Sequence, residues 1–158
     1  MHWQGRCYRS VARTPQTPST NAVFVEVGAP VATVDLTKET FEQTVVDNDT
    51  VLVDFWAAWC GPCRQFAPVY DKVSEQYPDA VFAKVDTEAQ PELSEYFEIR
   101  SIPTLMIFRD NIGIYSQPGA LPEAALTDLL DQALALDMDE VREEIGSQDD
   151  HEHEHDHA

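Results

Sequence analysis

The chain has 158 residues, of which 43% are hydrophobic, and its 29 acidic and ten basic residues give a formal net charge of −19. This charge argues against a nucleic-acid-binding protein, because a polyanion would be repelled. No apolar run approaches the roughly 18 residues that a membrane-spanning helix needs, and three cysteines are too few for a secreted disulfide framework. The composition therefore predicts one soluble, intracellular domain.

The first zone, residues 1–30, carries three arginines and one glutamate and is rich in Ser, Thr and Pro. It shows no apolar periodicity, so we predict a disordered extension. No apolar core of a secretory signal peptide is present. The arginine-bearing, acid-poor composition fits a mitochondrial transit peptide, and the alternative is a dispensable extension.

The middle zone, residues 31–136, alternates strand and helix patterns. The run 51–57 is apolar except for Asp54 and predicts a strand buried on both faces. Apolar residues at helical spacing predict a first helix that contains Val46, a third helix with Tyr96 on its inner face, and a last helix with Leu134 on its apolar stripe. Strands are expected at 31–34, 51–57, 80–85, 104–108 and 112–115, and helices after Thr37 and at 63–77, 91–97 and 121–136. This order, βαβαβαββα, predicts an α/β domain with a central mixed sheet and helices on both faces.

The last zone, residues 137–158, carries ten acidic residues and one arginine. Asp137 and Glu140 form a capping pair that begins a short helix, expected over 137–146. Residues 147–158, which end in alternating His and carboxylate side chains, predict a disordered acidic tail. The alternative is weak binding of Zn, Ni or Cu, but a flexible tail does not fix ligand geometry, and we expect no metal site.

Two cysteines stand three residues apart where the strand 51–57 ends, in Trp59-Cys60-Gly61-Pro62-Cys63. The free N–H groups and positive dipole at the start of the following helix stabilise a thiolate, so Cys60 is expected to have a lowered pKa and to act as a nucleophile. Cys63, one turn later, is close enough to form a disulfide with Cys60. A zinc site would need two more soft ligands, and Cys7 and the histidines lie in the tails. A structural disulfide is disfavoured, because so small a loop constrains the unfolded chain little.

Two segments of this zone, 51–63 (VLVDFWAAWCGPC) and 100–105 (RSIPTL), resemble the two signatures of the thioredoxin family. The segments 83–86 (AKVD) and 118–121 (PGAL) match the family in the expected order. The resemblance covers residues 31–136 and implies the thioredoxin fold. Asp110-Asn111 stands where many members have Asn-Gly, and Asn tolerates the left-handed conformation of such a turn.

The resemblance implies a role for each residue of the redox centre. Cys60 would attack a client disulfide, and Cys63 would resolve the mixed disulfide, leaving a Cys60–Cys63 bond. Asp54 would accept the Cys63 proton through water; a buried carboxylate has a raised pKa that suits this task. The alternative is an Asp that is only hydrogen-bonded at a sheet end. Lys84 would tune Asp54 electrostatically, or would be an ordinary edge lysine.

The resemblance also implies a client-binding surface around the thiol. Pro103 would be a cis-proline facing the cysteines, and it would leave the Ile102 backbone free to pair with an extended client. Trp56 would pack beneath the site and help to tune it. The implied substrate-binding residues are Trp59, Gly61, Pro62, Ile102, Pro103, Gly119 and Ala120.

The implied function is that of a protein-disulfide reductase and electron carrier working by dithiol–disulfide exchange. The implied partners are disulfide-containing client proteins and a thioredoxin reductase, which would supply electrons from NADPH through FAD. No cofactor is expected on this chain, which has no G-x-G-x-x-G motif. A monomer in the cytoplasm is expected, or in mitochondria if residues 1–30 are a transit peptide. The alternatives are a disulfide oxidase or isomerase of the same fold and a non-catalytic holdase or interaction protein.

Overall fold

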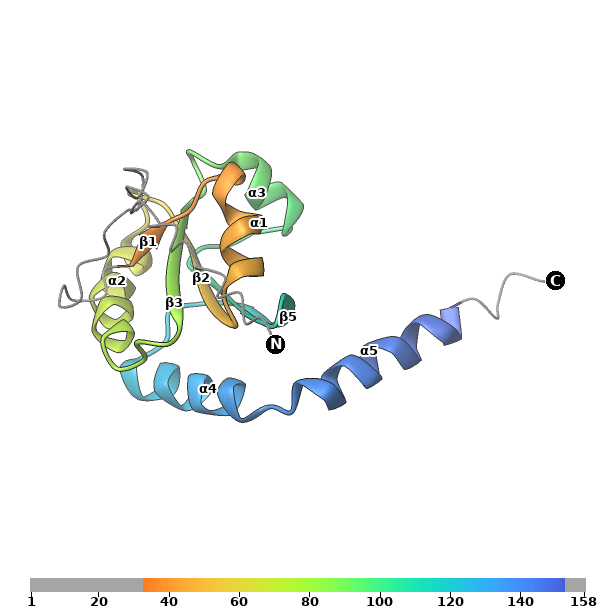
Figure 1. The fold of residues 1–158 in the computed structure, drawn as a ribbon. Helices are drawn as coiled ribbons and strands as arrows, with labels where there is room; N and C mark the ends of the chain where they lie inside the picture. Colours follow the sequence, from red (N-terminus) through yellow and green to blue (C-terminus); the bar gives the residue numbers. More distant parts are fainter. Residues whose placement is uncertain (1–32, 153–158) are drawn as a thin grey trace, which may run out of the picture.

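The computed structural model describes residues 33–152, with side chains described through residue 147 (Figure 1). The predictions for residues 1–30, for Cys7 and for the terminal histidines lie outside the described residues. Within the described range, no helix combines the length and the apolar composition needed to cross a membrane.

A five-stranded mixed sheet forms the centre of the domain (Figure 1). Its order is β1-β3-β2-β4-β5; β3 runs parallel to both β1 and β2, whereas β4 is antiparallel to β2 and β5. The central position of β2 explains its nearly continuous apolar sequence, because both of its faces are covered. The strands are β1 (Val34–Asp35), β2 (Thr50–Trp56), β3 (Val81–Asp86), β4 (Thr104–Arg109) and β5 (Ile112–Pro118).

Helices cover both faces of this sheet. Phe41 of α1 and Leu93 of α3 pack in one apolar cluster with Val51 and Val53 of β2. The alternate β2 residue Leu52 packs in a second cluster with α2 and α4 on the opposite face. The helices are α1 (Lys38–Asp47), α2 (Gly61–Ser74), α3 (Pro91–Tyr96), α4 (Glu123–Ala135) and α5 (Met138–Glu152). The predicted order of elements and the α/β class are confirmed.

The helix that carries the second cysteine starts earlier than its apolar pattern indicated. It begins at Gly61 rather than at residue 63, because Pro62 in the first turn has the φ angle that a helix start requires and needs no hydrogen-bond partner there. Pro68 lies inside α2 without ending it. The helix ends at Ser74, before the expected residue 77.

Two residues expected on apolar helix faces lie at the surface instead, because Tyr96 and Leu134 are 79% and 40% exposed. Val46 belongs to the first helix, as expected, and is 55% exposed. A flat sheet covers only part of a helix, so residues at the margins of an apolar stripe stay in water. In the six-residue helix α3, Leu93 alone is buried.

The C-terminal helix α5 extends away from the body of the domain (Figure 1). It runs to Glu152, so the predicted range 137–146 was too short, and residues 147–152 of the predicted tail belong to the helix. Gly146 weakens a helix by about 1 kcal/mol, which is too little to end it without a proline or a cap. The rest of the predicted tail lies outside the described residues.

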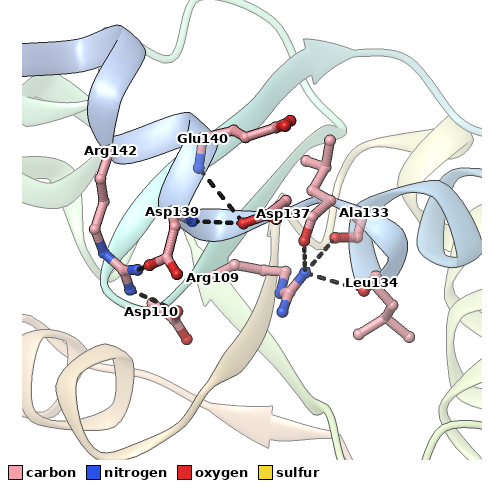
Figure 2. A network of polar contacts seen from close by, with 9 residues as sticks. Arg109, Asp110, Ala133, Leu134, Asp137, Asp139, Glu140 and Arg142 are labelled. Carbon is pink, nitrogen blue, oxygen red and sulfur yellow. Dashed lines mark hydrogen bonds and ion pairs between the residues drawn. The ribbon is translucent and has the colours of Figure 1, made fainter.

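Polar contacts hold the start of α5 in place after α4 (Figure 2). Asp137 caps α5, because its Oδ1 accepts hydrogen bonds from the backbone N–H groups of Asp139 at 2.9 Å and Glu140 at 3.5 Å, which confirms the helix start predicted at Asp137. Arg142 of α5 pairs with Asp110 at 2.7 Å, in the β4–β5 turn. Asp110 and Asn111 both have left-handed backbone angles, with φ of 49° and 65°.

Candidate active site

The two cysteines of the predicted redox centre form a disulfide at the junction between β2 and α2, with their Cα atoms 5.3 Å apart. Cys60 is the N-cap residue of α2, and its Sγ accepts a hydrogen bond from the backbone N–H of Cys63 at 3.3 Å. The free N–H groups of a helix start favour negative charge on the sulfur that they face. The geometry thus places Cys60 where a thiolate is stabilised.

A cavity of about 400 Å³ lies against Cys60. Trp59, Gly61, Pro62 and Ile102, which the sequence assigned to client binding, line this cavity. Cys60 and Cys63 are 4% and 2% exposed, but Cys63 does not line the cavity. A disulfide that enters the cavity therefore meets the sulfur of Cys60 and not that of Cys63.

The segment before β4, which contains Ile102 and Pro103, lies next to Cys60. The Ile102–Pro103 peptide bond is cis, and the Ile102 carbonyl oxygen lies 3.7 Å from the Cys60 Sγ. The backbone N–H of Gly119 donates to the Pro103 carbonyl at 2.8 Å. Gly119 and Ala120 are exposed beside this segment, but they do not line the cavity at Cys60.

Asp54 lies in the middle of β2, opposite Lys84 of β3 and Leu105 of β4, and its side chain is buried. Neither carboxylate oxygen has a hydrogen-bond partner among the described residues. Burial raises the pKa of Asp54 from 3.8 to about 7, although the positive charge of Lys84 opposes this effect. The carboxyl therefore exchanges a proton near neutral pH, as a group that serves a thiol must.

Lys84 lies on an internal strand, because β3 is flanked by β1 and β2, so Lys84 is not an edge lysine. Its Nζ lies 5.5 Å from the centre of the Trp56 ring, in range of a cation–π interaction. Trp56 packs against the cluster formed by Ala57, Cys60 and Cys63. Trp56 does not line the cavity at Cys60.

Several residues at the cavity were not predicted from the sequence. Glu88 accepts a hydrogen bond from the indole Nε1 of Trp59 at 2.9 Å, across 29 positions of the chain. No periodicity or motif links these two residues, so no sequence signal was available for the pair. Glu88 does not line the cavity itself. The lining residues that no sequence signal marked are Thr87, Ser94, Ile99 and Arg100, and Ser101 also lines it.

The described part of the chain contains no grouping of three or more His, Cys, Asp or Glu side chains that could hold a metal ion. Within that part, Cys60 and Cys63 are paired with each other.

The chain is similar to known proteins in sequence and in fold. The chain is 65% identical over 117 residues to "Putative thioredoxin 2" of Streptomyces coelicolor, which covers 74% of this chain and 87% of the relative. It is 48% identical over 101 residues to "Thioredoxin 1" of Synechococcus elongatus, covering 63% of this chain and 94% of the relative. Among solved structures, the N21Q mutant thioredoxin from Halobacterium salinarum NRC-1 superposes with a TM-score of 0.64 at 34% identity, covering 68% of this chain and 96% of that one.

The family model described as Thioredoxin matches residues 32–132, which include every strand of the sheet and the disulfide. The fold, the Cys-Gly-Pro-Cys pair at a helix start and the sequence relatives agree, and the chain belongs to the thioredoxin family.

Proposed function

We propose that this protein reduces disulfides of client proteins by dithiol–disulfide exchange through Cys60 and Cys63, and that a thioredoxin reductase then re-reduces it. The observation that carries the proposal is that only one of the two disulfide sulfurs belongs to a residue that lines the cavity. Both cysteines are buried, but Cys60 caps α2 and lines the cavity, whereas Cys63 lies in the first turn of α2 and does not line it. One sulfur is placed to meet a client and the other to complete the exchange.

The first step is attack by the Cys60 thiolate on one sulfur of the client disulfide. A mixed disulfide forms between Cys60 and the client, and the second client sulfur leaves as a thiolate that takes a proton from solvent. The N–H groups at the start of α2 favour the thiolate before the attack.

In the second step Cys63 loses its proton and attacks the Sγ of Cys60. The Cys60–client bond breaks, and the client sulfur that was bound to Cys60 leaves as a thiolate and takes a proton from solvent. Both client sulfurs are now reduced, and two electrons have passed from the protein to the client. Asp54 is the proposed acceptor of the Cys63 proton, through water, because its buried carboxyl has a pKa of about 7. The product is the disulfide that the structure contains.

Ile102 and Pro103 provide the proposed docking edge for an extended client strand. Proline has no N–H group, so the backbone of Ile102 is the part of this segment that can pair with a client. Trp59, Gly61 and Pro62 supply the surface on the other side of Cys60. Gly119 and Ala120 extend this surface beyond the cavity.

The oxidised protein needs an external source of electrons. The family relationship supports a thioredoxin reductase as that source, with NADPH and FAD bound to the reductase and not to this chain. A reducing compartment such as the cytoplasm fits this direction of electron flow.

The test is reduction of insulin by dithiothreitol with and without the protein. We expect the intact protein to accelerate the reaction and Cys60→Ser to lower the rate to that of dithiothreitol alone. Cys7→Ser is the matched control, because it removes a thiol outside the pair, and it should keep full activity. Equal rates for Cys60→Ser and the intact protein would show that the thiol mechanism is wrong.

A second variant tests the partners. Cys63→Ser lacks the resolving thiol, so it should hold clients and the reductase as mixed disulfides on Cys60. A reductase recovered from a lysate on this variant, and released by dithiothreitol, supports the proposed recycling. Release of the trapped proteins without a reductant would contradict it.

A further inference from the structure

The indole of Trp59 forms one wall of the cavity beside Cys60, although 68% of this residue is exposed to solvent. An exposed side chain of this kind has several rotamers, and a client that binds against it must select one. The described contacts of Trp59 include one polar anchor, the hydrogen bond from its Nε1 to Glu88 Oε1 at 2.9 Å. The orientation of the indole therefore depends on where Glu88 is held.

Glu88 lies in a firmly held turn after β3. Its backbone N–H donates to Asp86 Oδ1 at 2.9 Å. The preceding residue, Thr87, donates to the Trp56 carbonyl oxygen through both its backbone N–H at 2.9 Å and its hydroxyl at 3.1 Å. Since Trp56 is only three residues from Trp59, the contacts form a closed ring that joins the end of β2 to this turn.

We propose that Glu88 is a positioning residue for client binding. Its carboxylate holds the Trp59 indole against the turn that contributes Thr87 to the cavity wall, before a client arrives. The client then meets a preformed apolar surface, and less conformational entropy is lost on binding. This inference rests on the proposed function, because it concerns docking of a client at Cys60.

Glu88 acts through Trp59 and does not line the cavity itself. Its loss should therefore weaken the binding of client and transition state alike, which raises KM and leaves kcat nearly unchanged. Ordering one large side chain corresponds to roughly a two- to tenfold rise in KM for insulin in the Glu88→Ala variant. In Glu88→Gln the amide oxygen can still accept the indole hydrogen bond, so the KM should return to that of the parent.

Glu95→Ala is the matched control, because it removes an exposed carboxylate from the neighbouring helix α3. It should leave KM unchanged. The proposal is overturned if Glu88→Ala keeps the parental KM, if Glu88→Gln behaves like Glu88→Ala, or if Glu95→Ala raises KM equally.

A second readout does not depend on activity. The indole N–H resonance of Trp59 can be identified by NMR as the one lost in Trp59→Phe. In Glu88→Ala this proton should exchange with water faster than in the parent, in Glu88→Gln or in Glu95→Ala. Faster exchange without insulin reduction by the parent would refute the proposed function alone, whereas unchanged exchange would refute the role of Glu88.

Discussion

Asp54 is the only charged side chain among the buried residues that the structure describes. Its carboxylate has no hydrogen-bond partner there, and burial raises its pKa to about 7. The folded state therefore binds the proton more tightly than the unfolded chain between about pH 4 and pH 7. Stability is highest below the unfolded pKa and decreases as the pH rises through 7.

Replacing Asp54 by Asn should remove this pH dependence. The difference between pKa values of 3.8 and about 7 corresponds to on the order of 4 kcal/mol. From pH 4 to pH 8, the unfolding free energy of Asp54→Asn should therefore rise relative to that of the parent by up to this amount. Urea unfolding of the oxidised proteins at both pH values measures the change. Asp79→Asn, at an exposed carboxylate, should show no such rise.

Single residues were predictable where their chemistry is local. Cys60 and Cys63 are three positions apart, and an acid inside an apolar strand marks Asp54 without knowledge of its neighbours. The pairing of Trp59 with Glu88 was not predictable, because it depends on how the turn after β3 meets the end of β2. Such contacts arise from tertiary packing and leave no spacing in the sequence.

Between elements, Arg109 joins β4 to the end of α4 (Figure 2). Its guanidinium donates to the carbonyl oxygens of Ala133 at 2.8 Å and of Leu134 and Leu136 at 3.1 Å each. A helix end leaves its last carbonyl groups without partners, and a cation there also interacts favourably with the helix dipole. Arg109 therefore caps the C-terminal end of α4.

Arg109→Met should destabilise the domain by about 2–3 kcal/mol, because charge-assisted hydrogen bonds are lost and carbonyl groups are left unsatisfied. Arg142→Gln is the comparison, since its ion pairs with Asp110 and Asp139 are exposed and should contribute less than about 1 kcal/mol. Unfolding in urea, followed by circular dichroism, measures both. Equal losses for the two variants would contradict this role of Arg109.

The existence of each helix and strand was predictable, but several boundaries were not. The start of α2 at Gly61 depends on Pro62, whose effect an apolar pattern does not contain. The length of α5 was underestimated because its outer turns carry few apolar residues. The exposed position of Tyr96 follows from the shortness of α3, which was visible only once the helix had been placed.

For the whole molecule, the net charge of −19 acts on everything that approaches Cys60. A strongly negative protein attracts cationic partners and repels anionic ones, and salt screens both effects. We expect the reduced protein to react faster with cationic cystamine than with anionic glutathione disulfide. The ratio of the two rate constants should fall by on the order of tenfold between about 10 mM and about 300 mM salt.

Stopped-flow measurement of both reactions tests this expectation. A variant that ends at Leu136 lacks the ten acids and one arginine of residues 137–158, and its ratio should depend less on salt. A salt-independent ratio in the full chain would mean that charges far from the cavity do not affect the reaction.

The redox centre and the root of α5 lie at opposite ends of β2. Thr50, at the first end, pairs with Arg109 beside the turn that Arg142 contacts, whereas Trp56, at the other end, leads to Cys60. Seven strand residues separate the two ends by about 20 Å, and α5, which is about 22 Å long, extends away from the body of the domain (Figure 1). A chain tethered to a solid support or to a larger assembly through α5 would therefore keep its reactive sulfur at the end of the sheet that is remote from the point of attachment.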